Sequence, residues 1–465
     1  MSTATLPQSL PDDVRKPVAK LTLWPLVAAT FFMVSGGAYG TEDIVHGAGY
    51  GRGILILVLA PLVWSLPTAF MIAELSSALP AEGGYYAWVR RALGDFWGFQ
   101  EAWLSLVASV FDMAIYPTLF VAYLTRLVPW FGAGRRDVMV ALGVVIVCAA
   151  LNLAGVHVVG VTSLWLFLLL STPFALIVLL GPFKVGTLAH AATQPVTSTV
   201  GLLGGTLIAM WNYMGWDNAS TIAQGVERPQ HTYPRAMLTA VALVALSYIL
   251  PVLAVYITGV PASAFETGSW ADVARLLGGN WLSGALVLGG MISGFGMFNA
   301  LVMSYSRLPL AMAQDGMLPP AFARVHPKTQ APWVAILVCA AGWALCLGLG
   351  FERLVTLDVM LYGGSLLLEF IALVALRIRE PQLPRTFRVP GGLAGAILAG
   401  VLPTLLLALA VIHGEQERVL GLNGLVFGLL LIGAGFASYY ATSPFRRARR
   451  AAAATKDPAQ TCVPP

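Results

Sequence analysis

Charged residues are scarce in this chain of 465 residues. Asp, Glu, Lys and Arg make up 11% of it, whereas about a quarter of an ordinary soluble domain is charged. Hydrophobic residues make up 58%, so the polar residues are too few to cover a molecule that faces water on all sides. The composition therefore excludes an ordinary soluble enzyme. It also excludes disorder over most of the length, because disordered chains are poor in apolar residues.

Motifs for metal, disulfide and nucleotide chemistry are missing as well. The Cys and His residues show no paired or metal-ligand spacing, which argues against a disulfide framework and a zinc site. No Walker sequence is present, and the glycines of residues 46–53 do not form the dinucleotide-binding pattern. Basic residues are not combined with elements that read nucleic acid. We therefore expect no cofactor, no metal, no enzymatic activity and no nucleic-acid partner.

Long apolar runs are abundant instead. A membrane span needs about 20 mostly apolar residues, and reading for such runs yields twelve candidates. Residues 1–20 are polar and lack a signal-peptide pattern, so the first span should stay in the mature protein. The candidate spans cover residues 23–46, 53–77, 97–125, 137–154, 159–181, 200–223, 236–258, 281–305, 332–350, 354–376, 393–413 and 421–442.

The distribution of basic residues predicts the orientation. With twelve spans both termini lie on one side, and the segments of that side hold 19 of the 27 Lys and Arg residues. Cytoplasmic loops are the basic ones, so we expect both termini in the cytoplasm of a multi-pass protein of the cell (plasma) membrane. The basic loops should contact lipid headgroups.

Two spans are interrupted by glycine and polar residues at membrane depth. The first contains SGGAYGTED at 35–43 and the second contains WNYMGWDNAS at 211–220. Single small residues often serve close helix packing, but unwound backbone in a membrane is tolerated only where it lines a cavity. Each break opens a block of five spans, a pattern typical of inverted-repeat secondary transporters. The predicted parts are a tail (1–20), a first repeat (21–185), an inverted second repeat (198–378), two extra spans (390–443) and a disordered cytoplasmic tail (444–465).

Acidic residues lie in the spans without any Lys or Arg. A charge at mid-bilayer costs at least about 2.5–3.5 kcal/mol, so such acids are functional candidates. The alternative at each position is a carboxylate that caps a helix or accepts structural hydrogen bonds. We expect Asp112 and Asp217 to contact a cation, with Glu42 or Asp43 assisting. The acids counted in the spans are Glu42, Asp43, Glu74, Glu101, Asp112, Asp217 and Glu369.

Three of these acids are candidates for binding a coupling ion, namely Glu74, Glu101 and Asp112. Asp112 lies in the middle of its span, where a purely structural role is hardest to argue. Glu74 could instead accept structural hydrogen bonds near the cytoplasmic end of span 2. Aromatic residues flank both breaks, and beside a cavity they can close it or hold an ammonium group. Trp211 is our candidate for such a gate.

Six segments form a recognisable set. They are SGGAYGTED (35–43), AELSSALPAEGGYYAWV (73–89), FWGFQE (96–101), FDMAIYP (111–117), WDNASTIAQGVERPQHTYPRAM (216–237) and AQDGMLPP (313–320). Together they resemble the amino acid–polyamine–organocation superfamily, and more closely its polyamine:proton symporter branch. The resemblance covers spans 1–10, whereas spans 11 and 12 match in hydropathy only.

The resemblance implies an all-α membrane protein with the leucine-transporter fold: a 5+5 inverted repeat with broken spans 1 and 6, plus two extra spans. It places substrate at the two breaks, where the first supplies backbone groups, Gly215 marks the second, and Trp211 is the gating aromatic. Acids at the matching positions would bind a polycation. The expected substrate-binding residues are Ser35, Gly36, Gly37, Ala38, Tyr39, Glu42, Asp43, Asp112, Trp211, Tyr213, Gly215, Trp216 and Asp217.

The chain departs from that pattern at Gly215, where plant members tend to have Tyr, and at His46, where Arg is common. Some proton-coupled relatives carry a Lys in span 5, and its absence here keeps a sodium-like site open, with Ser304 and Ser306 as candidates. We predict a secondary active permease that imports a polyamine or related aminated solute with protons. The alternative is a permease or exchanger for neutral or cationic amino acids. A sensor or a channel fits the broken-helix pair less well.

Overall fold

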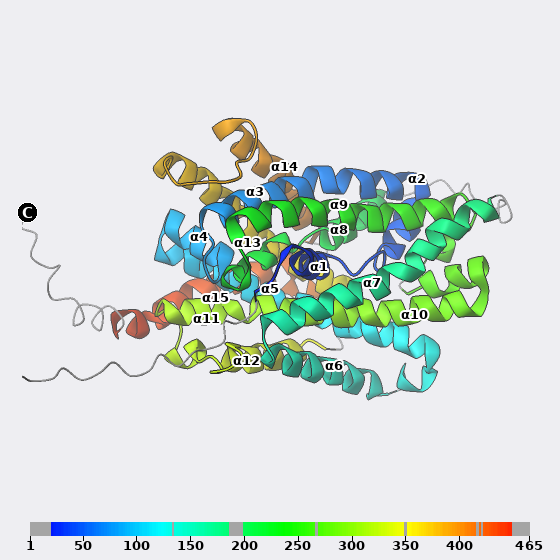
Figure 1. The fold of residues 1–465 in the computed structure, drawn as a ribbon, viewed down its shortest axis with the longest axis horizontal. Coiled ribbons are helices and arrows are strands. Elements are labelled where there is room, and N and C mark those ends of the chain that lie inside the picture. Colours follow the sequence, from blue (N-terminus) through cyan, green and yellow to red (C-terminus); the bar gives the residue numbers. More distant parts are fainter. Residues whose placement is uncertain are drawn as a thin grey trace, which may run out of the picture.

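The fold is a bundle of helices that run roughly along one axis (Figure 1). The computed structural model describes residues 20–132, 134–185, 199–265, 268–347, 351–414, 418–419 and 422–448. Nine helical segments in these ranges are long and apolar enough to cross a membrane, and two shorter apolar helices accompany them. Many large apolar side chains on the outer helices are exposed, as expected for a surface that faces lipid. The chain is a multi-pass membrane protein.

The helices follow the apolar runs of the sequence. The α-helices are α1 (Leu23–Val34), α2 (Glu42–Ala60), α3 (Leu66–Ala78), α4 (Gly84–Leu93), α5 (Asp95–Leu127), α6 (Arg136–Leu153), α7 (Val156–Leu180), α8 (Thr199–Asn212), α9 (Pro229–Tyr256), α10 (Trp270–Tyr305), α11 (Arg307–Gln314), α12 (Trp333–Ala344), α13 (Phe351–Arg379), α14 (Gly392–Gly414) and α15 (Gly424–Ala441). A π-helix, η1 (Pro61–Ser65), joins α2 to α3. The 3-10 helices are η2 (Pro129–Gly132), η3 (Gly181–Lys184), η5 (Trp216–Thr221), η6 (Ala223–Gly225), η7 (Ala262–Ala264) and η8 (Pro320–Ala323).

Both predicted helix breaks are confirmed. Helix α1 ends at Val34 and α2 begins at Glu42, with two glycines of positive φ between them. Helix α8 ends at Asn212, and Gly215 has a φ of 91° before η5 begins. The second half of this span is therefore a 3-10 helix rather than an α-helix. In Figure 1, α1 lies in the middle of the bundle, where it packs on α7, α9, α10 and η5.

Several boundaries of the sequence prediction were wrong. The region 259–280 was expected to be a loop, but α10 already begins at Trp270 and continues through a kink at Gly279, whose φ is 76°. Trp270 is fully buried against Phe265, and this contact anchors the added helical segment before residue 281. Helix α4, between spans 2 and 3, was not foreseen because its apolar face is short. Two-residue strands, β1 (Arg418–Val419) and β2 (Leu422–Asn423), pair antiparallel in a chain expected to be all-α.

The C-terminal tail also begins later than predicted. The chain is helical over 443–448, where the Arg446 guanidinium stacks 3.8 Å from the Tyr439 ring centroid and donates to the Tyr439 carbonyl at 2.7 Å. These contacts fix the first basic residues of the expected tail. The rest of that tail and residues 1–19 lie outside the described residues.

One end of the bundle is rich in arginine and is called the basic end below. It comprises α4, α11 and the last turn of α13, and α4 and α11 lie together at the left of Figure 1. Ion pairs tie these elements together: Arg90 contacts Asp315, and Arg91 contacts Glu380 at 2.7 Å. The concentration of arginines at one end matches the charge asymmetry of the predicted loops.

The bundle is closed at its basic end by backbone pairing. The amide of Leu21 donates to the Gly225 carbonyl at 2.8 Å, and the amide of Glu227 donates to the Leu21 carbonyl at 2.9 Å. These bonds join the residues before α1 to those after η6. A buried ion pair between Arg307 and Glu82, at 2.5 Å, lies on the same side.

Candidate functional site

A small cavity lies between the two helix breaks. Its volume is about 10 Å³, roughly the space of one water molecule, so entry of a larger solute requires side chains to move. No Lys or Arg of the described part of the chain lines it. The cavity is lined by Met33, Val34, Asp112, Tyr116, Trp211, Met214, Gly215, Asn218, Tyr305 and Tyr362.

Asp112 of α5 supplies the acidic group of this cavity. Its Oδ1 accepts a hydrogen bond from the Tyr116 hydroxyl at 2.5 Å, and its Oδ2 accepts one from the Tyr305 hydroxyl at 3.4 Å. The indole N–H of Trp211 is a further donor. The side chain is only 5% exposed. All three partners are neutral donors, so a charged carboxylate here lacks a cation, and an ammonium group or a proton would supply it.

Aromatic rings surround this carboxylate. Tyr116 and Trp211 stack with their centroids 6.3 Å apart and an angle of 24° between the rings, while Tyr305 and Tyr362 complete the lining. Ring faces attract cations, by roughly 0.5–2 kcal/mol each. The C-terminal end of α1 also faces the cavity at Met33 and Val34, and helix C-terminal ends carry partial negative charge. The arrangement is suited to an ammonium group.

Asp217 lies one layer behind the cavity. It is buried at the start of η5, and its Oδ1 accepts a hydrogen bond from the Tyr362 hydroxyl at 2.5 Å. The same hydroxyl accepts one from the Gly215 amide at 3.1 Å. Tyr362 therefore links Asp217 to the lining, so the structure brings Asp112 and Asp217 to one site, with Tyr362 between Asp217 and the cavity.

Glu42 is the first residue of α2, and its carboxylate accepts hydrogen bonds outside the cavity instead of lining it. Its Oε2 accepts the Gly40 amide at 2.5 Å, and its Oε1 accepts the Tyr123 hydroxyl at 2.8 Å and the Gly268 amide at 3.3 Å. A carboxylate is favourable there because a helix N-terminus is positively polarised. Asp43, the next residue, does not line the cavity either. The contacts of Glu42 match the alternative of a carboxylate that accepts structural hydrogen bonds, rather than direct cation contact.

The rest of the first break is held by internal bonds. The Gly37 amide donates to Ser35 Oγ at 3.1 Å, and the Ala38 carbonyl accepts the Trp270 indole N–H at 2.8 Å. A Cβ at Gly36 would lie 1.8 Å from Ser293 Oγ of α10, so the close packing of the break on α10 requires glycine at position 36. Tyr39 donates to the Leu286 carbonyl at 2.6 Å. These residues shape the break, and none of them lines the cavity.

Two aromatic residues of the second break have packing roles. The Tyr213 hydroxyl donates to the Leu57 carbonyl at 2.9 Å, and the Trp216 indole N–H donates to the Tyr213 carbonyl at 2.7 Å. Both side chains are fully buried outside the lining. Of the four aromatics that flank the breaks, only Trp211 faces the cavity, where the gating hypothesis requires it.

Gly215 allows a close approach between the two breaks. A Cβ at this position would lie 2.6 Å from the Met33 carbonyl oxygen, and the φ of 91° disfavours any L side chain. We expect Gly215→Ala to lower the free energy of unfolding by about 2–4 kcal/mol, from left-handed strain and overpacking together, and to reduce transport at least tenfold. Thermal unfolding in detergent and substrate uptake measure the two effects. Gly204→Ala in α8, where a Cβ meets nothing within 4 Å, is the control and should change neither; equal behaviour of the two variants would contradict the argument.

Glu74 is the most strongly paired of the coupling-ion candidates. Its Oε1 and Oε2 accept Arg377 Nε and Nη2 at 2.9 and 2.5 Å, Arg385 Nε lies 3.1 Å from Oε1, and the Val389 amide donates at 2.7 Å. The spans predicted from sequence contain no base. Arg377 and Arg385 follow predicted span 10 in the sequence, and the structure brings both into contact with Glu74. Glu74 thus matches the structural alternative. Glu101 is fully buried, and among the described residues its Oε1 accepts the Ser105 hydroxyl at 3.0 Å while its Oε2 has no hydrogen-bond partner.

Sequence reasoning missed a buried acid beside the site. Asp358 of α13 was absent from our count, although it lies mid-run in LVTLDVMLY (354–362), the same signal that identified Asp112. It is 1% exposed, and neither carboxylate oxygen has a hydrogen-bond partner among the described residues. Asp112 and Asp217 lie within electrostatic range of it. Tyr305 and Tyr362 were missed too, because single tyrosines in apolar spans carry no distinguishing pattern.

The serines proposed for a sodium-like site join α10 to η5. Ser304 Oγ donates to the Asn218 carbonyl at 2.9 Å or its side-chain oxygen at 2.8 Å, and it accepts the Thr221 hydroxyl at 3.1 Å. Ser306 follows the end of α10 and is buried. Ser304 thus cross-links the second break, and a sodium role stays a prediction.

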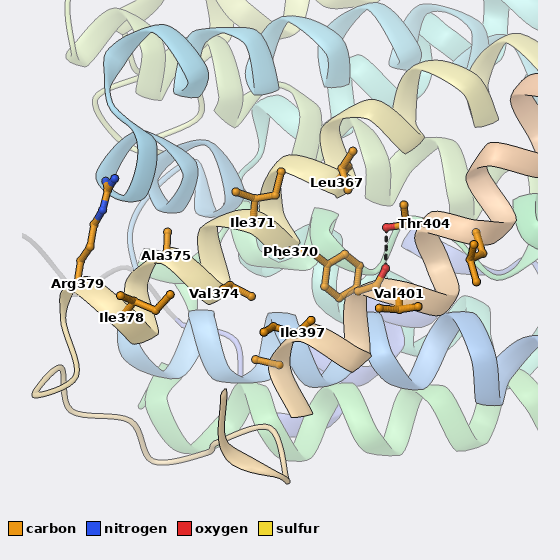
Figure 2. Close-up of a pocket in the computed structure, with 13 residues that line it drawn as sticks. Leu367, Phe370, Ile371, Val374, Ala375, Ile378, Arg379, Ile397, Val401 and Thr404 are labelled. Atoms are coloured by element: carbon orange, nitrogen blue, oxygen red, sulfur yellow. Dashed lines mark hydrogen bonds between the residues drawn. The ribbon is translucent and has the colours of Figure 1, made fainter. Parts of the chain in front are cut away.

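A larger hollow lies away from both breaks. Figure 2 shows this apolar groove of about 700 Å³ between α13 and α14, with Phe370 and Val401 in its wall and Arg379 at its end. None of the predicted site residues lines it. Its apolar lining resembles the lipid-facing surface rather than a site for a polar solute.

Comparison with known proteins identifies the family. The family model described as "Amino acid permease" matches residues 27–432, and the chain belongs to this family. "Polyamine transporter RMV1" of Arabidopsis thaliana is 35% identical over 91% of this chain and 87% of its own length. "Polyamine transporter PUT1" of Oryza sativa subsp. japonica is 36% identical over 88% and 77%. An "Uncharacterized transporter" of Mycobacterium tuberculosis is 28% identical over 72% and 74%. The protein is a membrane transporter and not an enzyme.

Proposed function

We propose that this permease imports polyamines, or closely related aminated solutes, across the plasma membrane and couples their entry to protons. The observation that carries the proposal is the Asp112 carboxylate, enclosed by Tyr116, Trp211 and Tyr305 in a cavity without Lys or Arg. Two plant relatives over most of the chain's length are named polyamine transporters, which supports the same substrate class.

The first break favours a cation over a zwitterion. In a broken-helix transporter the amides of a half-helix N-terminus can receive a substrate carboxylate. Here the carboxylate of Glu42, the first residue of α2, already accepts the Gly40 amide. An amino acid would bring a second carboxylate to this acidic end, whereas a polyamine brings none. The geometry therefore supports polyamines over amino acids.

The architecture we propose is the 5+5 inverted repeat with twelve spans, both termini at the cytoplasmic side. The nine long helical segments, together with the short helices α1, α8 and α12, provide the helices for such an arrangement. Arginines gathered at the basic end support its assignment to the cytoplasm. The proposed repeats remain 21–185 and 198–378, with two extra spans over 390–443.

The test is uptake of labelled putrescine and spermidine into proteoliposomes, beside alanine, leucine and arginine, with and without an inward proton gradient. We expect polyamine uptake that saturates, rises with the gradient and collapses with a protonophore. Amino acid uptake that ignores the gradient and needs internal substrate would mean an exchanger, and it would contradict the proposal.

A further inference from the structure

Two polar stripes face each other along the contact between α5 and α13, which pack closely over most of their length. Glu101, Ser105 and Asp112 recur at helical spacing on α5, and Tyr362, Ser365 and Glu369 do so on α13. All six side chains are buried. Because α5 leaves the basic end and α13 returns to it, Glu101 and Glu369 lie nearer that end than the cavity does.

The inner acids of these stripes form a pair without a base. Both carboxylate oxygens of Glu369 and Oε2 of Glu101 have no hydrogen-bond partner among the described residues. Both side chains are completely buried. Each lies within electrostatic range of the other and of Asp217. A naked carboxylate pair in a low-dielectric interior is strongly unfavourable, so this pair must hold at least one proton or another small cation.

The groups around this acid pair favour a proton over a metal ion or a hydrated cation. The groups that face the pair are Tyr85 of α4, Asp217 of η5 and Tyr362 of α13, together with Ser105; none is basic. Among the described bases, Arg377 lies two helical turns beyond Glu369, and it is engaged by Glu74. No group of three possible metal ligands was found among the described residues. A completely buried pair with few oxygen donors suits a proton better than a hydrated ion.

The pair is separate from the ammonium site. Glu101 and Asp112 are 11 residues apart on α5, which corresponds to about 16 Å along a helix. Asp217 is in electrostatic range of both ends, since it influences Glu101 and Glu369 as well as Asp112. A cation at Asp112 and a proton on the Glu101–Glu369 pair both act on Asp217. This shared electrostatic interaction couples the two sites.

We propose that Glu101 and Glu369 form the proton-binding site of this transporter, separate from the ammonium site at Asp112. The inference rests on the proposed function, because it names the residues that carry the coupling proton. When the inner side opens, water reaches the pair and accepts its proton; when the outer side opens again, the pair takes up a proton from the water on that side. No other bond is made or broken.

The test compares two kinds of transport by Glu369→Gln and Glu101→Gln in proteoliposomes. We expect gradient-driven putrescine accumulation to fall from its wild-type value to a ratio near 1. Putrescine counterflow, which requires no net proton movement, should stay within about twofold of wild type and shows that the variants fold. Glu380→Gln is the matched control and should change neither kind of transport, because Glu380 is a half-exposed acid just beyond α13. The double variant combines Glu101→Gln with Glu369→Gln. If it still accumulates putrescine in a protonophore-sensitive way, the proposal is overturned. Loss of counterflow in folded protein would overturn it as well.

A second readout separates this proposal from the proposed function. The infrared spectrum of the wild type in membranes at neutral pH should show the C=O stretch of a protonated carboxylic acid, and Glu369→Gln should reduce it. This band does not depend on the transported solute, so it survives if putrescine is not the substrate. A wild-type spectrum without the band, or a band unchanged in both Gln variants, would refute the site itself.

Discussion

Asp112→Asn is expected to abolish polyamine uptake. The amide keeps the shape of the side chain and can still accept the Tyr116 hydroxyl, but it removes the charge that faces the cavity. Truncating one partner of a buried, hydrogen-bonded charge pair costs about 2–5 kcal/mol, so about 3 kcal/mol corresponds to a loss of roughly 100-fold in affinity. Uptake and binding of labelled putrescine and spermidine in proteoliposomes measure the change.

The control for this variant is Asp137→Asn, an identical substitution at the start of α6, where the exposed carboxylate accepts the neighbouring Val138 amide. It should leave uptake unchanged. Amino acid uptake, if the chain has any, should survive Asp112→Asn because a zwitterion needs fewer acids. Intact polyamine uptake by the variant would remove Asp112 from the substrate site.

Glu74→Gln is expected to destabilise the fold even more than Gly215→Ala does. The carboxylate is completely buried and contacts Arg377 and Arg385, which are 10% and 4% exposed at their side chains. Removing one member of a buried ion pair leaves uncompensated charge and costs about 3–5 kcal/mol. Thermal unfolding of the purified protein in detergent should show a clear fall in melting temperature.

Transport by the surviving folded protein distinguishes two roles of Glu74. If the residue is structural, transport per folded molecule and its dependence on the proton gradient should match the wild type. A stable variant that has lost proton coupling would restore Glu74 as a coupling-ion site. Glu380→Gln is the matched control, because it breaks the half-exposed Arg91 pair, and such pairs contribute about 1 kcal/mol or less.

The sequence predicted the helix breaks because their signal is local. Glycines and polar residues inside an apolar run have few explanations, and the structure places Gly37 and Gly215 at positive φ as that signal implies. Asp112 could be predicted for the same reason, since an acid at membrane depth requires a partner. The kink at Gly279 lies in a similar local pattern, Gly278-Gly279-Asn280, but this pattern falls just before the predicted span 281–305, where no helix was predicted.

Partners distant in sequence could not be predicted. Glu74 and Arg377 are 303 residues apart, and a reading limited to spans treats the arginine as a loop residue. Glu42 was grouped with the cation ligands because its position beside the break was known, whereas its contacts with Tyr123 and Gly268 depend on tertiary packing. The identity of an acid follows from sequence, but its role follows from the donors that surround it.

The closure at the basic end has a consequence for how such a transporter can diversify. Its two bonds join backbone atoms of Leu21, Gly225 and Glu227, so a substitution at these positions removes none of the bonding groups unless it introduces proline. The neighbouring contact between Arg307 and Glu82 depends on side chains and can be strengthened or lost by a single substitution. A single substitution can therefore tune the contact between Arg307 and Glu82, whereas the backbone bonds beside it persist through sequence change.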